Sequence, residues 1–258
     1  TLLAKGIHSI LPPLTFDQVI AVSQIYSVIG GLSSSQPLIT TRPFRSVHHT
    51  ASKISIVGGG QQLQPGEISL AHLGILFFDE LPEFPTEVLE VLRQPLEERT
   101  IVISRASGSV QYPADVMLVA AMNPCKCGYY KDKEKPCSCG LHEIKKYQSK
   151  ISGPLLDRFD MLLEVPREQV KTVLQDQKGE SSQSIKTAVY ECWLRQQKRY
   201  KATGIATNAQ LSAKGIHQYI KLSPDTQEIL IQAAQQLHLS TRVVHRTIKL
   251  ARTIADLE

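Results

Sequence analysis

The sequence predicts an α/β fold, in which a parallel sheet is sandwiched between helices, followed by a small all-helical domain. Two short apolar runs, residues 74–78 and 116–122, are bounded by turn residues, as is typical of parallel strands buried on both faces. Beyond residue 184, apolar side chains recur at helical spacing instead. The 258 residues, 42% hydrophobic and 21% charged, suffice for one large domain or a medium domain with a smaller companion, and they exclude wholesale disorder.

Two helices are predicted before the first strand. Residues 1–11 place apolar side chains at helical spacing and are followed by a Pro-Pro pair, which cannot continue a helix. A second helix is expected from Thr15, where T-F-D-Q has the pattern of a capping box, to Gly30-Gly31. Residues 33–70 are mostly Ser, Gly, Pro and polar side chains, so we interpret them as an elaborated loop region with short strands near 54–57.

The middle of the chain alternates strands with helical segments. The predicted elements are a buried strand at 74–78, a helix at 86–92, a hairpin at 100–113 that turns through 106–108, a second buried strand at 116–122 and a third strand at 161–165. A Cys-rich loop at 125–140 interrupts this pattern. We therefore predict an α/β domain over residues 1–165.

A change of character follows at residue 166. Residues 166–183 contain Pro, Gly and Ser and are predicted to be a linker. The remainder, residues 184–258, is predicted to be a helical domain with helices at 184–200, 225–237 and 241–257.

Charge and composition narrow the choice of partners and compartment. The formal charge of +5 and the pI of about 8.9 permit a polyanionic partner without requiring one. The longest apolar stretches are far shorter than the roughly 20 residues of a membrane-spanning helix, and no segment resembles a signal peptide, so we expect no membrane partner. Five cysteines without a secretory signal favour a reducing compartment, the cytoplasm.

Two acids end the first buried strand. Asp79 and Glu80 follow G-I-L-F-F directly, and ligands of open α/β sheets bind at the carboxyl ends of the strands. A carboxylate there can hold Mg²⁺ beside nucleotide phosphates, and a second acid can act as base toward an attacking water. The alternative, with about equal weight for the pair alone, is that both acids cap the following helix.

Four further residues fit the same plan. Thr1, followed by an apolar helix, matches the residue after the Lys of a phosphate-binding loop, so we expect the sequence to begin inside such a loop. Asn123 ends the second buried strand, where it would meet the γ-phosphate. Arg158 is a cation that can reach a phosphate, including one on a neighbouring subunit, and Arg242 begins the last helix. Each arginine alone is more readily explained as a surface salt-bridge partner.

Several long strings give the sequence a specific resemblance. They are R-P-F-R-S-V-H-H-T-A-S at 42–52, P-G-E-I-S-L-A-H-L-G-I-L-F-F-D-E at 65–80, L-R-Q-P-L-E-E at 92–98, N-P-C-K-C-G at 123–128, L-L-D-R-F-D at 155–160 and R-T-I-A-D-L at 252–257. With these strings the sequence resembles an AAA+ P-loop ATPase, and within that class the magnesium-chelatase-like ATPases of the ComM/YifB group. The resemblance covers nearly the whole chain.

The resemblance implies ATP and Mg²⁺ as cofactors and gives the residues roles. Thr1 would be the Walker A threonine, a Mg²⁺ ligand. Asp79 would bind the metal and Glu80 would polarise the hydrolytic water, as the Walker B pair. Asn123 would be sensor 1, and the two arginines would be the arginine finger, Arg158, and sensor 2, Arg242. The Walker A lysine and glycines are absent, so this chain by itself is expected to be inactive.

The resemblance also implies a ring with a central pore. An arginine finger acts on the neighbouring subunit, so a homo-hexamer is implied, with the C-terminal domain as its lid. An insert at 53–69 and the hairpin 100–113 match elements that point into the pore in this clade. Lys53 and Arg105 are our candidates for gripping a phosphate backbone, although both can be ordinary solvated charges. For the His48-His49 pair we expect a structural hydrogen-bonding role.

Four cysteines are clustered in C-x-C-x₉-C-x-C. Cys125, Cys127, Cys137 and Cys139 offer four thiolates to a tetrahedral Zn²⁺, although C-x-C is a looser fit than the usual C-x-x-C; free or redox-active thiols are the alternative. The polar loop between them cannot build a core, so something else must order it. Six lysines nearby form either a nucleic-acid patch or a solvated surface: Lys126, Lys131, Lys133, Lys135, Lys145 and Lys146.

Three functions are compatible with these patterns. We expect the ATPase core of a hexameric motor that acts on single-stranded or branched DNA, in branch migration during recombination or natural transformation. The first alternative is a chelatase motor that drives metal insertion through a partner subunit. The second is a non-catalytic ATP-sensing scaffold. Stimulation of ATP hydrolysis by DNA separates the first function from the other two.

Overall fold

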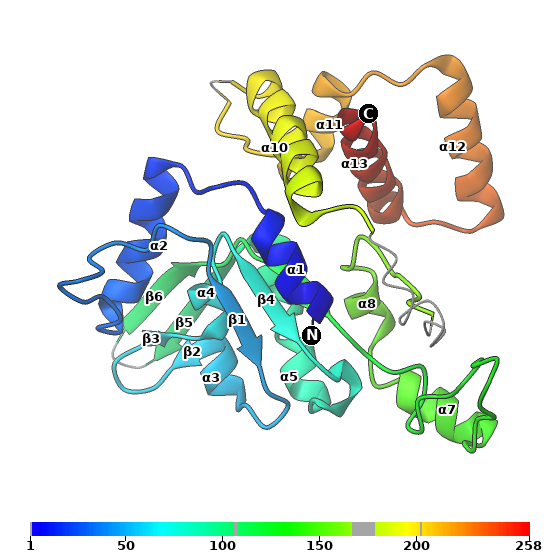
Figure 1. Cartoon of the computed structure of the whole chain (residues 1–258), viewed down its shortest axis with the longest axis horizontal. Helices are drawn as coiled ribbons and strands as arrows, with labels where there is room; N and C mark the ends of the chain where they lie inside the picture. Colours follow the sequence, from blue (N-terminus) through cyan, green and yellow to red (C-terminus); the bar gives the residue numbers. More distant parts are fainter. Residues whose placement is uncertain (1, 106–107, 167–178, 202) are drawn as a thin grey trace. The chain divides into compact units, whose positions relative to one another are not determined.

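The computed structural model describes residues 2–105, 108–166, 179–201 and 203–258 (Figure 1). Two compact units are present, the first containing Pro13–Phe159 and the second containing the described residues after 178. Within the described ranges, no helix combines the length and the apolar character required to cross a bilayer.

A three-stranded parallel sheet lies at the centre of the first unit. Its order is β1-β4-β7, formed by Phe44–Val47, Ile75–Phe78 and Met117–Ala120. The predicted strands at 74–78 and 116–122 are thereby confirmed as β4 and β7. The first strand, β1, lies in the region that we expected to be loop, because F-R-S-V is short and mixes apolar with polar side chains. The α/β prediction is confirmed by this sheet and the helices that flank it.

The middle strand β4 is held tightly between its neighbours. All four of its side chains are buried, and it pairs in register with β1 on one side and β7 on the other. Gly74 precedes it at a point where a Cβ atom would lie 2.0 Å from the carbonyl oxygen of Pro43. Only glycine permits this approach, which lets the Ile75 amide donate to the Pro43 carbonyl at 2.8 Å.

Helices and short helical turns surround the sheet. In chain order they are α1 (Leu2–Ile10), α2 (Phe16–Val28), α3 (Lys53–Val57), α4 (Glu67–Leu70), η1 (Leu81–Glu83), α5 (Thr86–Glu90), α6 (Arg93–Glu98), α7 (Leu141–Gln148) and α8 (Gly153–Leu156). The helices predicted at the N-terminus and at 86–92 are confirmed. The capping box is present, with the Thr15 hydroxyl accepting from the Gln18 amide and the Gln18 side chain accepting from the Thr15 amide.

Two of the strand predictions, at 54–57 and at 161–165, are wrong. Residues 54–57 belong to helix α3, because the Ser52 hydroxyl caps the first turn and Ile56 is buried in the core. A short antiparallel pair, β2 (Gly58–Gly59) with β3 (Gln64–Pro65), follows that helix. Residues 161–165 form no strand, since within the described ranges no strand pairs with them, and their apolar side chains are exposed.

The predicted hairpin is confirmed as a separate two-stranded sheet. It consists of β5 (Thr100–Arg105) and β6 (Gly108–Pro113), paired antiparallel; residues 106–107 of its expected turn lie outside the described residues. The buried Tyr112 side chain donates its hydroxyl hydrogen to the Leu63 carbonyl at 2.8 Å. The hairpin is therefore bound to the segment that includes α3 and β2-β3.

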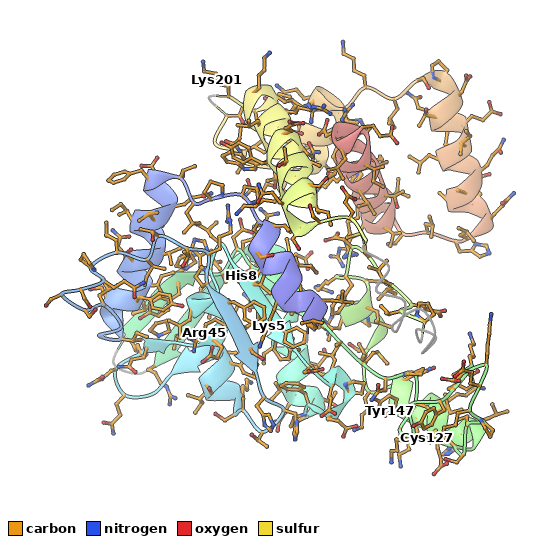
Figure 2. The ribbon with its side chains drawn as sticks, in the orientation of Figure 1. Lys5, His8, Arg45, Cys127, Tyr147 and Lys201 are labelled. Atoms are coloured by element: carbon orange, nitrogen blue, oxygen red, sulfur yellow. The ribbon has the colours of Figure 1, made fainter. Side chains whose placement is uncertain are left out.

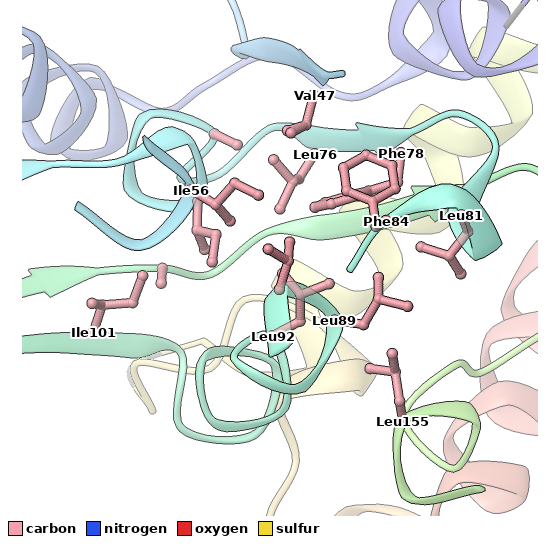
Figure 3. Close-up of a cluster of buried hydrophobic side chains, with 14 of the residues drawn as sticks. Val47, Ile56, Leu76, Phe78, Leu81, Phe84, Leu89, Leu92, Ile101 and Leu155 are labelled. Carbon is pink, nitrogen blue, oxygen red and sulfur yellow. The ribbon is translucent and has the colours of Figure 1, made fainter. Parts of the chain in front are cut away.

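One apolar core unites these elements (Figure 3). Leu76 and Phe78 of β4 lie in it together with Phe84, and the Phe78 and Phe84 rings are 4.7 Å apart. Other buried members of this core include Val47 of β1, Ile56 of α3, Ile68 of α4, Leu81 of η1, Leu89 of α5, Leu92 just before α6, Ile101 of β5, Tyr112 of β6 and Leu155 of α8. Packing in this core holds β4 in place and so sets where the residues after it leave the sheet.

The second unit is helical, as predicted. Its elements are α10 (Ser182–Arg199), η2 (Asn208–Gln210), α11 (Ala213–Tyr219), α12 (Pro224–Gln236) and α13 (Thr241–Leu257). Helix α11 was not predicted, because its seven residues are too few to show a clear period. A serine caps the N-terminus of each of the four α-helices with its side-chain oxygen. Most of the expected linker, residues 167–178, lies outside the described residues.

A buried carboxylate ties the second unit together. Asp256 on α13 is 1% exposed and accepts hydrogen bonds from Arg199 of α10, Asn208 of η2 and Arg252 of its own helix. Although burial opposes ionisation, these donors hold the pKa of Asp256 far below its ordinary value. The carboxylate is thus charged and satisfied, and it links three segments.

Replacing this carboxylate should destabilise the second unit. We expect Asp256→Ala to lower the free energy of unfolding by about 3–5 kcal/mol, because it leaves buried arginine charge uncompensated. Because the folded pKa is depressed, the contribution of Asp256 should be complete above about pH 4 and should be lost as the pH falls below that value. Urea unfolding against pH measures both effects. The exposed Asp225→Ala is the control, and equal losses in the two variants would contradict this role.

Candidate functional site

Polar side chains follow all three strands of the sheet at one edge. Because β1, β4 and β7 are parallel and in register, the pairs His48-His49 and Asp79-Glu80 and the residue Asn123 leave from the same edge. The Leu81 amide donates to the Ala121 carbonyl at 3.0 Å, which ties the segment after β4 to the segment after β7. The sheet therefore brings together residues that are up to 75 positions apart in the sequence.

The two acids sit in a sharp turn. Asp79 is half-buried, and its Oδ1 accepts from the Glu80 amide at 3.1 Å. Glu80 has a φ of 52°, in the left-handed region, which costs a non-glycine residue about 1–2 kcal/mol. Its side chain is 57% exposed and accepts no capping hydrogen bond from η1. The turn thus presents the Glu80 carboxylate at the edge of the sheet, which disfavours the alternative of a helix cap.

A histidine that we had given only a structural role faces this carboxylate. The Nδ1 atom of His49 lies 3.9 Å from Oε2 of Glu80. The His49 ring lies 4.1 Å from the His48 ring in a tilted arrangement and meets Phe84 edge-on at 6.5 Å, so its position is set by both neighbours. The signal for this contact was the H-H pair directly after F-R-S-V, but it could be interpreted only with β1 in view.

Asn123 is connected to α7. Its side chain is exposed, while its backbone is hydrogen-bonded to the hydroxyl of the buried Tyr147. Burial, followed by the negative charges of Glu83 and Glu80, raises the pKa of Tyr147. The Gln148 side chain donates to the Pro124 carbonyl at 2.9 Å. Helix α7 therefore holds the backbone at Asn123 and Pro124 from outside the sheet.

This edge carries the donor set of a magnesium–phosphate site. The carboxylates of Asp79 and Glu80 and the amide of Asn123 are oxygen ligands of the type that Mg²⁺ prefers, and the exposed amide can also bind a phosphate oxygen. A base beside an ion-binding acid is the arrangement needed to activate water. Thr1, the remaining predicted metal ligand, lies outside the described residues.

Arg158 occupies a different place, against α6. Its guanidinium donates to the carbonyls of Arg93 and Pro154 and to the carboxylate of Glu97, and its side chain is 12% exposed. Nearby, the Ser152 hydroxyl donates to Glu90, which also pairs with Arg93. In this conformation these three hydrogen-bond partners of Arg158 all belong to its own chain.

The remaining predicted site residues belong to other elements. Arg242 is exposed in the first turn of α13, in the second unit. Lys53 is the exposed first residue of α3, and Arg105 is the exposed last residue of β5. The guanidinium of Arg105 lies against Gly59 of β2, 3.8 Å from the position that a Cβ would occupy there. Lys53 and Arg105 thus belong to two elements that share one core.

The four clustered cysteines converge, as their spacing predicts. The Sγ atoms of Cys125, Cys127, Cys137 and Cys139 all lie within 4.8 Å of one another. Hydrogen bonds from the backbone of Tyr129 and Ser138 lower the pKa of Cys127 to about 5. These residues can hold a metal ion.

The chain matches two family models and is similar to known proteins over its whole length. A family model described as magnesium chelatase, subunit ChlI, matches residues 1–173, and the model for the C-terminal part of that subunit matches residues 179–258. The chain is 41% identical over 259 residues to the uncharacterized protein YifB of Salmonella typhimurium and 40% identical to the competence protein ComM of Haemophilus influenzae. Each match covers 100% of this chain and 50% of the relative, so the chain spans about half the length of these curated relatives.

A more distant likeness is found to proteins of replication. The DNA replication licensing factor mcm6 of Dictyostelium discoideum is 29% identical over 163 residues, which is 63% of this chain and 16% of that protein. The licensing factor mcm7 of Schizosaccharomyces pombe is also 29% identical, over 150 residues.

Proposed function

The chain belongs to the magnesium-chelatase-like AAA+ ATPases of the ComM/YifB group, and on this premise we propose that it is the core of an ATP-hydrolysing motor that acts on DNA. The observation that carries the ATPase part is the edge where Asp79, Glu80 and Asn123 follow neighbouring parallel strands. Carboxylates beside a polar amide at this edge suit a magnesium–nucleotide complex.

Each residue at the edge has a separate task. Asp79 and, by resemblance, Thr1 would hold Mg²⁺, which would neutralise negative charge on the phosphates. Glu80 orients the attacking water and accepts its proton, and the nearby His49 ring restrains the Glu80 carboxylate. Asn123 donates its side-chain amide to the terminal phosphate. The left-handed turn at Glu80 keeps its carboxylate outside the sheet, where water can reach it.

Assembly into a ring, a homo-hexamer, would complete the site. Arg158 would reach the nucleotide of the neighbouring subunit, and Arg242 would contact it from the helical lid. Arg158 is paired with Glu97 in the single chain, so this role requires that it exchange Glu97 for a phosphate. Electrostatics supports this exchange, because a phosphate carries more negative charge than one carboxylate and accepts bidentate hydrogen bonds from arginine.

Action on DNA rests on three supporting observations. The distant relatives mcm6 and mcm7 are DNA replication licensing factors. The chain is mildly basic, with a formal charge of +5. Lys53 and Arg105 are exposed on the insert and the hairpin, which would line a pore of the ring and contact the phosphate backbone. Branch migration is the activity that we propose for the whole protein. The compartment that we propose is the cytoplasm, because the five cysteines form no disulfide with one another.

One alternative has an observation in its favour. The family model is named after a magnesium chelatase subunit, so the same core could drive metal insertion through a partner protein. The DNA motor is preferred because Lys53 and Arg105 are cations suited to a phosphate backbone.

The proposal is tested by ATP hydrolysis of the full-length protein with and without DNA. We expect single-stranded or branched DNA to stimulate turnover, and the stimulation to weaken with salt as phosphate contacts are screened. Turnover that requires a partner protein and ignores DNA would favour the chelatase alternative. Absence of any turnover would favour an ATP-sensing scaffold.

The general base can be tested by a change of one atom type. Glu80→Gln should lower hydrolysis at least about 100-fold, because the amide cannot accept the proton, while ATP binding stays within a few-fold. The matched control is Glu83→Gln, which lies three residues further along, outside the proposed machinery, and should retain turnover. Single-turnover hydrolysis and equilibrium ATP binding measure the two quantities. Normal hydrolysis by the Glu80 variant would refute the assignment.

The arginine finger can be separated from its structural pairing. Arg158→Ala should lower turnover about 1,000-fold, whereas Glu97→Gln, which breaks the ion pair but keeps the arginine, should remain active. Mixing Arg158→Ala with Glu80→Gln subunits should restore part of the turnover, since some interfaces then combine an intact finger with an intact base. Equal loss of activity and stability in both single variants, without rescue on mixing, would show a purely structural role.

A further inference from the structure

The loop that follows Asn123 has no core of its own. This cysteine loop, residues 125–140, contains turns and bends but no helix or strand, and all its residues are described. Cys125 is its one buried residue, at 0% exposure. Ordering sixteen residues costs on the order of 1–2 kcal/mol each in backbone entropy, and so little burial cannot offset that cost.

Three of the four sulfur atoms are spaced as in a tetrahedral metal site, and the fourth, Cys139 Sγ, lies within 4.8 Å of each of them. Cys125 Sγ lies 3.4 Å from Cys127 Sγ and 3.7 Å from Cys137 Sγ, and Cys127 and Cys137 are 3.5 Å apart. Tetrahedral bonds of about 2.3 Å from zinc to sulfur place neighbouring sulfur atoms about 3.8 Å apart. A disulfide requires about 2.05 Å, so these sulfurs are placed for a shared ion and not for bonds to one another.

Backbone amides are directed at the sulfurs as well. The Cys139 amide donates to Cys137 Sγ at 3.4 Å, and the backbone of Tyr129 and Ser138 is hydrogen-bonded to Cys127. Such bonds delocalise negative charge from a thiolate and orient its lone pairs toward a ligand. The C-x-C spacing, which looked too tight for a zinc knuckle, is therefore compatible with one.

We propose that the cysteine loop binds one Zn²⁺ through Cys125, Cys127, Cys137 and Cys139, and that this ion fixes the backbone at Asn123. Four thiolates around Zn²⁺ carry a net charge of −2 after their protons pass to solvent. The loop supplies a compensating charge of +2, because it contains four lysines and two acids: Lys126, Lys131, Lys133, Lys135, Asp132 and Glu134. This balance also explains the lysines without a nucleic acid.

The ion would act on the site through both ends of the loop. Cys125 lies two residues after Asn123, and the loop leads from Cys139 directly into α7. Helix α7 returns to the same place, where Tyr147 is hydrogen-bonded to the Asn123 backbone and Gln148 to the Pro124 carbonyl. Figure 2 shows Tyr147 and Cys127 in the same region of the chain. A metal that joins Cys125 to Cys139 therefore closes a loop of contacts that runs from Asn123 through the metal and α7 and back to Asn123 through Tyr147. The importance of that ring for catalysis rests on the proposed function; the metal site does not.

The metal is tested first, on the full-length protein purified under reducing, metal-replete conditions. Elemental analysis should give about one zinc per chain, and Co²⁺ exchanged for zinc should show the intense visible absorption of a tetrahedral thiolate site. Cys125→Ser should lose the metal, whereas the control Cys192→Ser, in the second unit, should keep it. Because Cys125 is fully buried and its replacement also perturbs folding, the Co²⁺ spectrum of the unmodified protein decides alone. No metal and no spectrum, with the thiols free or oxidised, would overturn the site.

The link to Asn123 is tested by hydrogen exchange before and after zinc is removed with a chelator. Amides of β7, Pro124-flanking residues and α7 should exchange faster in the zinc-free protein, while those of α13 stay unchanged. Unchanged exchange around Asn123 would overturn the link even if zinc is present. Neither result depends on ATP: a protein with zinc and faster exchange but no hydrolysis would refute the ATPase proposal and leave this inference standing.

Discussion

The parallel pairing of β4 with β1 and β7 is the interaction on which the rest of the first unit depends. All four of its side chains are buried, so a shift of register by one residue could draw the acid Asp79 into the buried part of the strand. Gly74 secures the start of β4 by letting the Pro43 carbonyl approach where no Cβ fits. With the strand fixed at both ends, its last residue must deliver Asp79 and Glu80 to the edge of the sheet.

The surroundings of this edge are polar and organised in separate networks. His49 lies beside the Glu80 carboxylate and meets the Phe84 ring edge-on, and α7 holds the backbone at Asn123. The Arg158 network, by contrast, stays on α6 and α8 and keeps its charge satisfied within one chain. A single chain thus contains an assembled acidic edge and, separately, an arginine whose charge is paired with Glu97.

The second unit depends on a buried ionic network more than on a large apolar core. Its helices bury few large side chains, so a charged residue at the centre has an unusual share in holding them together. Asp256 gives this contact direction, since each of its oxygens accepts bonds that only one placement of Arg199 and Asn208 can supply. The cysteine loop shows a third solution, in which a metal would replace the core that a polar sequence cannot build.

Local patterns were sufficient for most elements of the fold. The capping box at Thr15, the buried run of β4 and the helical period of α13 are each visible within a few residues, because helix capping, burial and periodicity act over short distances. The adjacent pair Asp79-Glu80 and the four cysteines were equally visible, since neighbours in sequence must be neighbours in space.

Other features could not be obtained in this way. Residues 54–57 have the composition of a strand but form a helix, because burial of Ile56 and the Ser52 cap outweigh a weak local preference. Residues 161–165, which are apolar except for Glu164, have no strand to pair with in the described part of the chain.

The sequence by itself determined the two-part α/β and helical organisation, the acidic pair and the thiol cluster. The tertiary structure alone decided that His49 faces Glu80, that Tyr147 holds Asn123 and that Glu97 holds Arg158. These contacts join segments that are 24 to 61 residues apart. Such contacts depend on how the sheet and its core place distant segments, and no periodicity or spacing within the chain records that placement.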